Sequence, residues 1–302
     1  MTGYAHPLYA RSLDEFGVPR ELPGCGGWIL ERAIEGADRR DAMGCYPLFS
    51  CERWSHLRSD LNRIGEELVA VSLVTDPFGE YDVRALRDCF PDVVAPFKKH
   101  FVVDLKLSFE SFVHEHHQRN ARASLRHVSV EVCTEPLANL RAWVNLYATL
   151  RERHNIRGIA AFSEYSFRQQ MSVPGIEAFR ATSEGEIVGM VLWFVQDDRA
   201  YYHLGAYSER GYELKASFAL FSRALQHFAE RGLRWLNLGA GAGVDAGAQT
   251  GLTRFKQGWS NTSRTTYFCG RIFDRKSYLQ IVQQKGIGAT SYFPAYRHRE
   301  FG

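Results

Sequence analysis

The residues best suited to chemistry lie in one stretch near the C-terminal end, 237–260, which reads NLGAGAGVDAGAQTGLTRFKQGWS. Small residues follow a strand-like apolar run, and Lys256 comes after them, beside an aromatic ring. A backbone without bulky side chains can approach a substrate closely, and a fixed cation can stabilise negative charge on a reacting oxygen. The alternative is a structural loop followed by a surface lysine.

The glycines at 239, 241 and 243 do not form a dinucleotide fingerprint. In that fingerprint a third glycine opens a helix directly after the strand, and the spacing G-x-G-x-G lacks this arrangement. Gly239, Gly241 and Gly243 are therefore interpreted as close-approach positions in a substrate site, or as a mobile loop. Asp245, next in the stretch, can hold the ammonium group of an amine or take its proton.

Several elements must position this stretch. Residues 176–207 predict a three-strand antiparallel meander, with turns at Ser183-Glu184-Gly185 and Asp197-Asp198. A long helix over 214–232 ends at Gly232, a favourable left-handed cap, and leads into a strand over 233–240. With a strand at 128–133 and two helices after it, the order over 129–240 is β-α-α-β-β-β-α-β.

The first part of the chain shows a similar but shorter pattern. Strands are expected over 26–34, 66–74 and 100–107, with a helix after Ser50 and another over 108–127. The second of these strands ends at Thr75-Asp76-Pro77, because proline cannot continue the ladder. The pattern restarts after residue 128, which suggests a domain boundary.

This order of elements resembles the GNAT acyltransferase fold, and three motifs narrow the resemblance to the FemAB-like enzymes. HHQRNARASLRHVSVEV, YYHLGAY and NLGAGAG…GLTRFKQGWS look like the crossing segment, the aromatic strand and the glycine-to-F-K segment of that family. The resemblance covers about residues 100–280. It implies an α/β fold of two GNAT-like units, 1–128 and 129–270, with 271–302 packing back on the first.

The resemblance implies an N-acyltransferase that forms an amide bond without a covalent enzyme intermediate. In the resembling enzymes the lysine of the F-K motif, here Lys256, sits at the reaction centre. Tyr202 falls where the family has an aromatic residue lining the cleft, although a packed core tyrosine is an equal alternative. Substrate contacts are expected from Phe255, Gly239, Gly241, Gly243, Arg254, Tyr165 and Trp259.

The donor is expected to be an aminoacyl-tRNA or another carrier-bound acyl group, with no tightly bound cofactor. Acetyl-CoA enzymes of this fold hold the pyrophosphate on a glycine-rich loop at a helix N-terminus. Here that place reads SERGYELKAS, so CoA is less favoured, although Arg210 and Lys215 can still attract phosphate. RNA contacts are expected from Arg119, Arg122 and Arg126 on one helix face, for which a solvated face is the alternative, and from the basic tail with Arg297 and Arg299.

The acceptor is expected to be the amine of a small metabolite or natural-product intermediate. Cell-wall members hold a diphosphate with an arginine before a tyrosine, and the matching segment here, GIAAFSEYSF, contains Tyr165 but no arginine. Arg157 can substitute by position. Two other functions stay open: a CoA-dependent acetyltransferase, and a non-catalytic module that binds RNA or an anionic metabolite.

Composition adds further limits. Residues 251–302 carry nine Lys or Arg against two Asp or Glu, a balance of +7 in a chain of net charge +3, so an anionic ligand is expected near this end. Six cysteines without a repeated C-x-x-C, and no apolar leader, indicate reduced thiols and a cytoplasmic protein. No run of about 18 apolar residues predicts a membrane span. His114, His116 and His117 fan around a helix, so no metal site is predicted.

Overall fold

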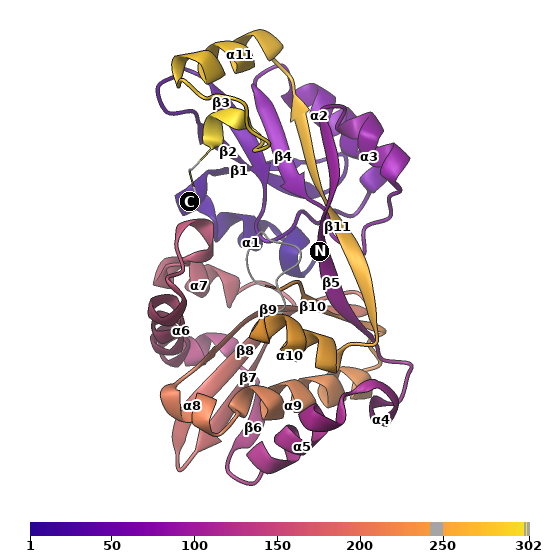
Figure 1. Ribbon diagram of the computed structural model, residues 1–302, viewed down its shortest axis with the longest axis vertical. Coiled ribbons are helices and arrows are strands. Elements are labelled where there is room, and N and C mark those ends of the chain that lie inside the picture. The colour runs from indigo at the N-terminus through magenta and orange to yellow at the C-terminus, as the bar shows by residue number, and fades with distance from the viewer. Residues whose placement is uncertain (242–249, 299, 301–302) are drawn as a thin grey trace. The chain divides into compact units, whose positions relative to one another are not determined.

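The computed structural model describes residues 1–241, 250–298 and 300, and its internal contacts divide the chain into two units (Figure 1). The central unit comprises residues 1–3, 98–156 and 161–264. The terminal unit comprises residues 4–97, 157–160 and 265–302. Residues 98–128, which the sequence analysis assigned to the first unit, are grouped with the central one, because their strand and helix pack on elements from 200 onward.

The terminal unit is built on strands β1 to β4 and part of β11, with helices packed on them. The strands have the order β1-β2-β3-β4-β11, antiparallel except for the parallel pair β3 and β4. Its elements are α1 (Pro7–Arg11), β1 (Val18–Leu22), β2 (Gly27–Ala33), β3 (Arg40–Gly44), the 3-10 turn η3 (Trp54–His56), α2 (Leu57–Ile64), β4 (Ala70–Val74), α3 (Val83–Cys89), part of β11 (Thr262–Ile272), α11 (Arg275–Gln284) and η6 (Ala295–Arg297). Ile29, Phe49, Leu61 and Val71 are fully buried between the sheet and α2.

The central unit is a six-stranded sheet of order β5-β10-β9-β8-β7-β6, in which only β9 and β10 are parallel. Its elements are the second part of β5 (Val93–Asp104), α4 (Phe109–Phe112), α5 (Glu115–Ser124), β6 (Ser129–Cys133), α6 (Leu140–His154), α7 (Glu164–Gln170), β7 (Ile176–Ser183), β8 (Glu186–Gln196), β9 (Arg199–Tyr207), α8 (Glu209–Glu213), α9 (Ala216–Glu230), β10 (Trp235–Gly239) and α10 (Gly251–Trp259).

The two faces of the central sheet carry different helices. Trp193 on β8 packs against Phe221 and Phe228 of α9. Phe194, the next residue, packs against His203, which in turn contacts Phe162 in front of α7. Because successive side chains of a strand point to opposite faces, α9 covers one face and the α6–α7 region covers the other, as Figure 1 shows for this unit.

The predicted meander is confirmed. β7, β8 and β9 pair in antiparallel register, with the first turn at Glu184-Gly185 and the second at Asp197, all at positive φ. Gly232 has φ +75°, as predicted for a left-handed cap.

Two predicted helices are interrupted in the structure. The expected helix over 108–127 is two helices, α4 and α5, because Val113 and His114 are extended. The expected start of the helix at residue 214 is also wrong, since Lys215 has φ +56° and separates α8 from α9. A non-glycine residue in the left-handed region cannot continue a right-handed helix.

Candidate active site

Lys256 is buried on α10 and points back to the end of β10. Its Nζ donates a 2.8 Å hydrogen bond to the carbonyl oxygen of Ala240, and the residue is 6% exposed. An ammonium group has three donors, and within the described residues this is the one hydrogen bond that Lys256 makes. Two of its N–H groups thus make no hydrogen bond to the described residues.

The backbone beside Lys256 requires a glycine. Gly239 has φ +75°, and a Cβ built on it would lie 3.1 Å from the lysine Nζ. The ladder between β10 and β5 is irregular between Asn237 and Gly239, which is where the chain leaves the sheet. A side chain at position 239 would have two effects. It would crowd the ammonium group of Lys256, and it would strain the backbone, because L-residues rarely adopt this positive φ.

Burial controls the charge of this site. Burial, reinforced by the nearby Lys98, lowers the pKa of Lys256 to about 7. Burial also lowers the pKa of His100 to about 4, helped by Lys256 and Lys98 and opposed by a hydrogen bond to Asn237. At neutral pH the histidine is therefore uncharged, and both protonation states of the lysine are populated.

Asn237 ties β5, β10 and Gly239 together. Its Oδ1 accepts a 2.9 Å hydrogen bond from Gly239 N and lies 3.0 Å from His100 Nδ1, which donates to it. The asparagine is 2% exposed. Sequence analysis missed Lys98, His100 and Asn237, and the available signal was the presence of polar residues inside apolar strands.

Aromatic packing fixes α10. Phe255 contacts Phe221 and Phe218 of α9, with ring centroids 4.8 and 5.0 Å apart. His117 of α5 places Nε2 2.9 Å from the carbonyl oxygen of Phe255. Trp259 is 2% exposed in the same core, so its indole contacts protein and offers little surface to a substrate.

Tyr202 presents its ring to the lysine. Lys256 Nζ lies 5.4 Å from the ring centroid, in cation–π geometry. The Tyr202 hydroxyl hydrogen bonds with Tyr207 and points toward Gly205. Burial raises the pKa of Tyr202, so the phenol is neutral at ordinary pH.

The other predicted positions are spread over the central unit. Gly241 approaches Thr253 of α10 so closely that a Cβ would collide with its hydroxyl. Gly243 and Asp245 lie outside the described residues. Arg254 is exposed on α10, and Tyr165 is 45% exposed on α7.

The basic residues proposed for the donor lie on α5, in the turn after it, on α8 and in the turn before α9. Arg297 was expected to contact RNA, but it is buried and paired with Asp41, and Arg299 lies outside the described residues. Arg119, Arg122 and Arg126 are exposed. Arg210 is exposed and forms an ion pair with Glu213, whereas Lys215 donates a 2.9 Å hydrogen bond to Asn120 of α5. The structure therefore brings Lys256, Gly239, Tyr202 and Phe255 together and leaves the arginines of α5 and α8 on the surface.

The described residues contain no group of three or more histidine, cysteine or carboxylate side chains suited to a metal ion. His117, from the run His114–His117, packs its ring against Phe255 and Trp259 and acts as a packing residue. In the described part of the chain no helix has the length and apolar character needed to cross a bilayer.

Comparison with known proteins gives the family of the central unit. Residues 114–257 match the family described as "Acetyltransferase (GNAT) domain". The chain carries a GNAT acyltransferase domain. The matched range begins just before α5 and runs through Lys256, so it contains most of the site. No curated protein matches the sequence.

Solved structures extend the likeness beyond the GNAT domain to both units. FemX is similar at TM-score 0.66 and 12% identity, with 91% of this chain and 93% of FemX covered. L-PGS from Bacillus licheniformis is similar at TM-score 0.57 and 15% identity, covering 95% and 97%. The C-terminal domain of a putative lysylphosphatidylglycerol synthetase from Agrobacterium fabrum is similar at TM-score 0.59 and 14% identity, covering 95% and 91%. The expected FemAB-like branch of the GNAT fold is confirmed.

Proposed function

We propose that this GNAT protein is an N-acyltransferase that joins an activated acyl group to the amine of a small metabolite. The observation that carries the proposal is the buried Lys256, held beside a side-chain-free backbone with two N–H groups uncommitted in the described residues. Burying an amine to 6% exposure costs folding free energy. A group retained despite that cost is a candidate for a functional role.

The reaction requires charge stabilisation more than covalent chemistry. The acceptor nitrogen attacks the acyl carbon and forms the amide C–N bond, and the ester or thioester bond breaks. The acyl oxygen is negative in between, and protonated Lys256 donates hydrogen bonds to it. The proton lost by the amine leaves with the donor's hydroxyl or thiol, so no enzyme-bound acyl group is needed.

Aminoacyl-tRNA is the donor that we favour. The segment that holds CoA in related enzymes contains Glu209 and Glu213, which repel a pyrophosphate. Its one glycine, Gly211, packs so tightly on Val188 that a Cβ would collide with the backbone, so packing accounts for this glycine. The similarity to FemX supports the same choice, and α5 with the turn after it offers three exposed arginines to phosphates.

The proposal is tested by incubating the purified protein separately with charged tRNA, acetyl-CoA and a metabolite extract. Mass spectrometry then identifies an amide product that depends on one donor. Phosphatidylglycerol is tested as a further acceptor, because one similar structure is named for lysylphosphatidylglycerol synthesis. It has no amine, so its hydroxyl would give an ester, and an ester product would overturn the amine as acceptor. An acetylated product with acetyl-CoA alone would favour the CoA alternative. No acylated product with any donor, together with tRNA or metabolite binding, would favour a non-catalytic module.

A further inference from the structure

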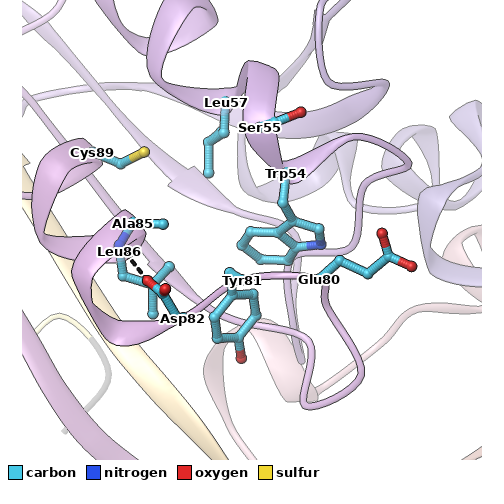
Figure 2. Close-up of a pocket in the computed structure, with 9 residues that line it drawn as sticks. All are labelled: Trp54, Ser55, Leu57, Glu80, Tyr81, Asp82, Ala85, Leu86 and Cys89. Carbon is cyan, nitrogen blue, oxygen red and sulfur yellow. Dashed lines mark hydrogen bonds between the residues drawn. The ribbon is translucent and has the colours of Figure 1, made fainter.

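The terminal unit contains a pocket of its own, far in sequence from Lys256. Its volume is about 530 Å³, a size that suits a small organic molecule. It lies between η3, the start of α2 and α3, and Figure 2 shows the side chains that line it. The lining residues are Trp54, Ser55, Leu57, Glu80, Tyr81, Asp82, Ala85, Leu86 and Cys89.

Two aromatic rings form a fixed wall of this pocket. The rings of Trp54 and Tyr81 are tilted at 52° with centroids 4.5 Å apart. The Tyr81 hydroxyl is held by Thr75 Oγ1 at 2.6 Å and by the carbonyl oxygen of Asp76 at 2.8 Å. The rings are therefore set before any ligand arrives, which lowers the entropy cost of binding.

Gly79 packs directly against both aromatic rings. A Cβ on this glycine would lie 2.5 Å from the Tyr81 ring and 2.6 Å from the Trp54 ring. Only a residue without a side chain lets the loop pass this close, so the turn before α3 is shaped around the aromatic pair.

The pocket carries negative charge on both sides of its aromatic pair. Glu80 and Asp82 are exposed, Figure 2 shows them on opposite sides of Trp54 and Tyr81, and no lysine or arginine lines the pocket. Asp82 uses Oδ1 to cap α3 through Ala85 N at 2.7 Å. Cys89, on the α3 side, feels the charges of Arg58, Arg271 and Asp88.

We propose that this pocket binds an organic ammonium ion, with its cationic group against the Trp54–Tyr81 rings, which have Glu80 on one side and Asp82 on the other. Aromatic faces attract cations, and nearby negative charge adds to the attraction. The apolar body of the ligand would lie against Leu57 and Leu86, which line the pocket and are buried. This site does not depend on Lys256 or on the reaction proposed above.

The test uses the full chain and three matched probes: 2-phenylethylamine, which is cationic at pH 7, neutral 2-phenylethanol, and anionic phenylacetate. Saturation-transfer NMR and calorimetry measure binding of each. The ammonium probe is expected to bind saturably and more tightly than the other two. Absence of saturable binding, or equal binding of the neutral probe, overturns the proposal.

Variants locate the site. The double variant Glu80→Gln with Asp82→Asn removes both charges while asparagine still caps α3. It should weaken the ammonium probe about three- to tenfold. Glu66→Gln, which removes one exposed charge outside the pocket, should leave affinity unchanged, as should Lys256→Ala. Unchanged affinity in the double variant would place the probe elsewhere and refute the assignment.

Discussion

The side chain of Lys256 turns back from α10 to the end of β10, where Nζ donates a 2.8 Å hydrogen bond to the carbonyl oxygen of Ala240. A neutral peptide oxygen satisfies one donor without neutralising the charge, in contrast to a carboxylate. The ammonium group is thus oriented but still able to respond to a new negative charge. That combination suits an oxyanion stabiliser, and it makes the site sensitive to small changes.

Lys256→Ala is expected to lower the rate of acyl transfer by about 10² to 10³, the usual cost of removing one oxyanion donor. Lys256→Met should lose as much, although it keeps most of the side-chain volume. Lys106→Met is a suitable control, because Lys106 is an exposed lysine in the turn after β5 and is not among the residues of the candidate site. Single-turnover rates, measured with whichever donor yields an acylated product in the test above, report the effect. Full activity in Lys256→Ala would falsify the catalytic role.

The same lysine makes stability depend on pH. Its pKa is about 7 in the folded protein against 10.5 as the ordinary value, so the unfolded chain binds more protons between these pH values. Stability contributed through this group is lowest below pH 7 and rises as the pH increases. From pH 7 to 9 the gain is about 2 kcal/mol. In urea denaturation, the unfolding free energy of Lys256→Met should lack this increase with pH. The prediction would be contradicted if the unfolding free energies of the variant and the unchanged protein varied with pH in the same way.

Gly239→Ala should impair both folding and activity. It costs about 1 kcal/mol for the left-handed backbone and also brings a methyl group 3.1 Å from Lys256 Nζ. Gly232→Ala is the matched control, since it has the same φ of +75° and nothing within 4 Å. The two variants should lose similar backbone energy, while only Gly239→Ala displaces the lysine. Equal acyl-transfer rates in the two variants would argue against a contact at Lys256.

The elements of the central unit were largely predictable because their signals are local. The alternating residues and the turns at Glu184-Gly185 and Asp197 defined the meander without tertiary information. Lys256 was found through a short motif after the glycines. The interruption at His114 was not predictable from helix propensity, since the extended backbone there donates a hydrogen bond to the carbonyl oxygen of Gly258, in a distant segment.

The polar residues near Lys256 could not be predicted from the sequence, for a different reason. His100 and Asn237 are 137 positions apart in sequence, and they meet because β5 pairs with β10. A single sequence contains no direct record of this pairing. The pocket at Trp54 and Tyr81 has the same origin, because its walls come from η3, a loop and α3. Strand β1 was missed because its five residues, Val18–Leu22, include proline and two charged side chains.

In the terminal unit, we expect substitution of Arg297 to lower the unfolding free energy strongly. Its guanidinium makes two hydrogen bonds to the fully buried Asp41, at 2.8 and 3.0 Å, and one to the carbonyl oxygen of Ala33. Among the described residues, Arg297→Met would leave the buried carboxylate with the more distant Arg32, at 3.5 Å, as its cationic partner. We expect a loss of about 3 kcal/mol in unfolding free energy, measured by urea denaturation. Arg275→Met removes an arginine that is exposed, although paired with Asp92, and should cost less than about 1 kcal/mol. Similar losses in the two variants would mean that burial of Asp41 does not set the cost.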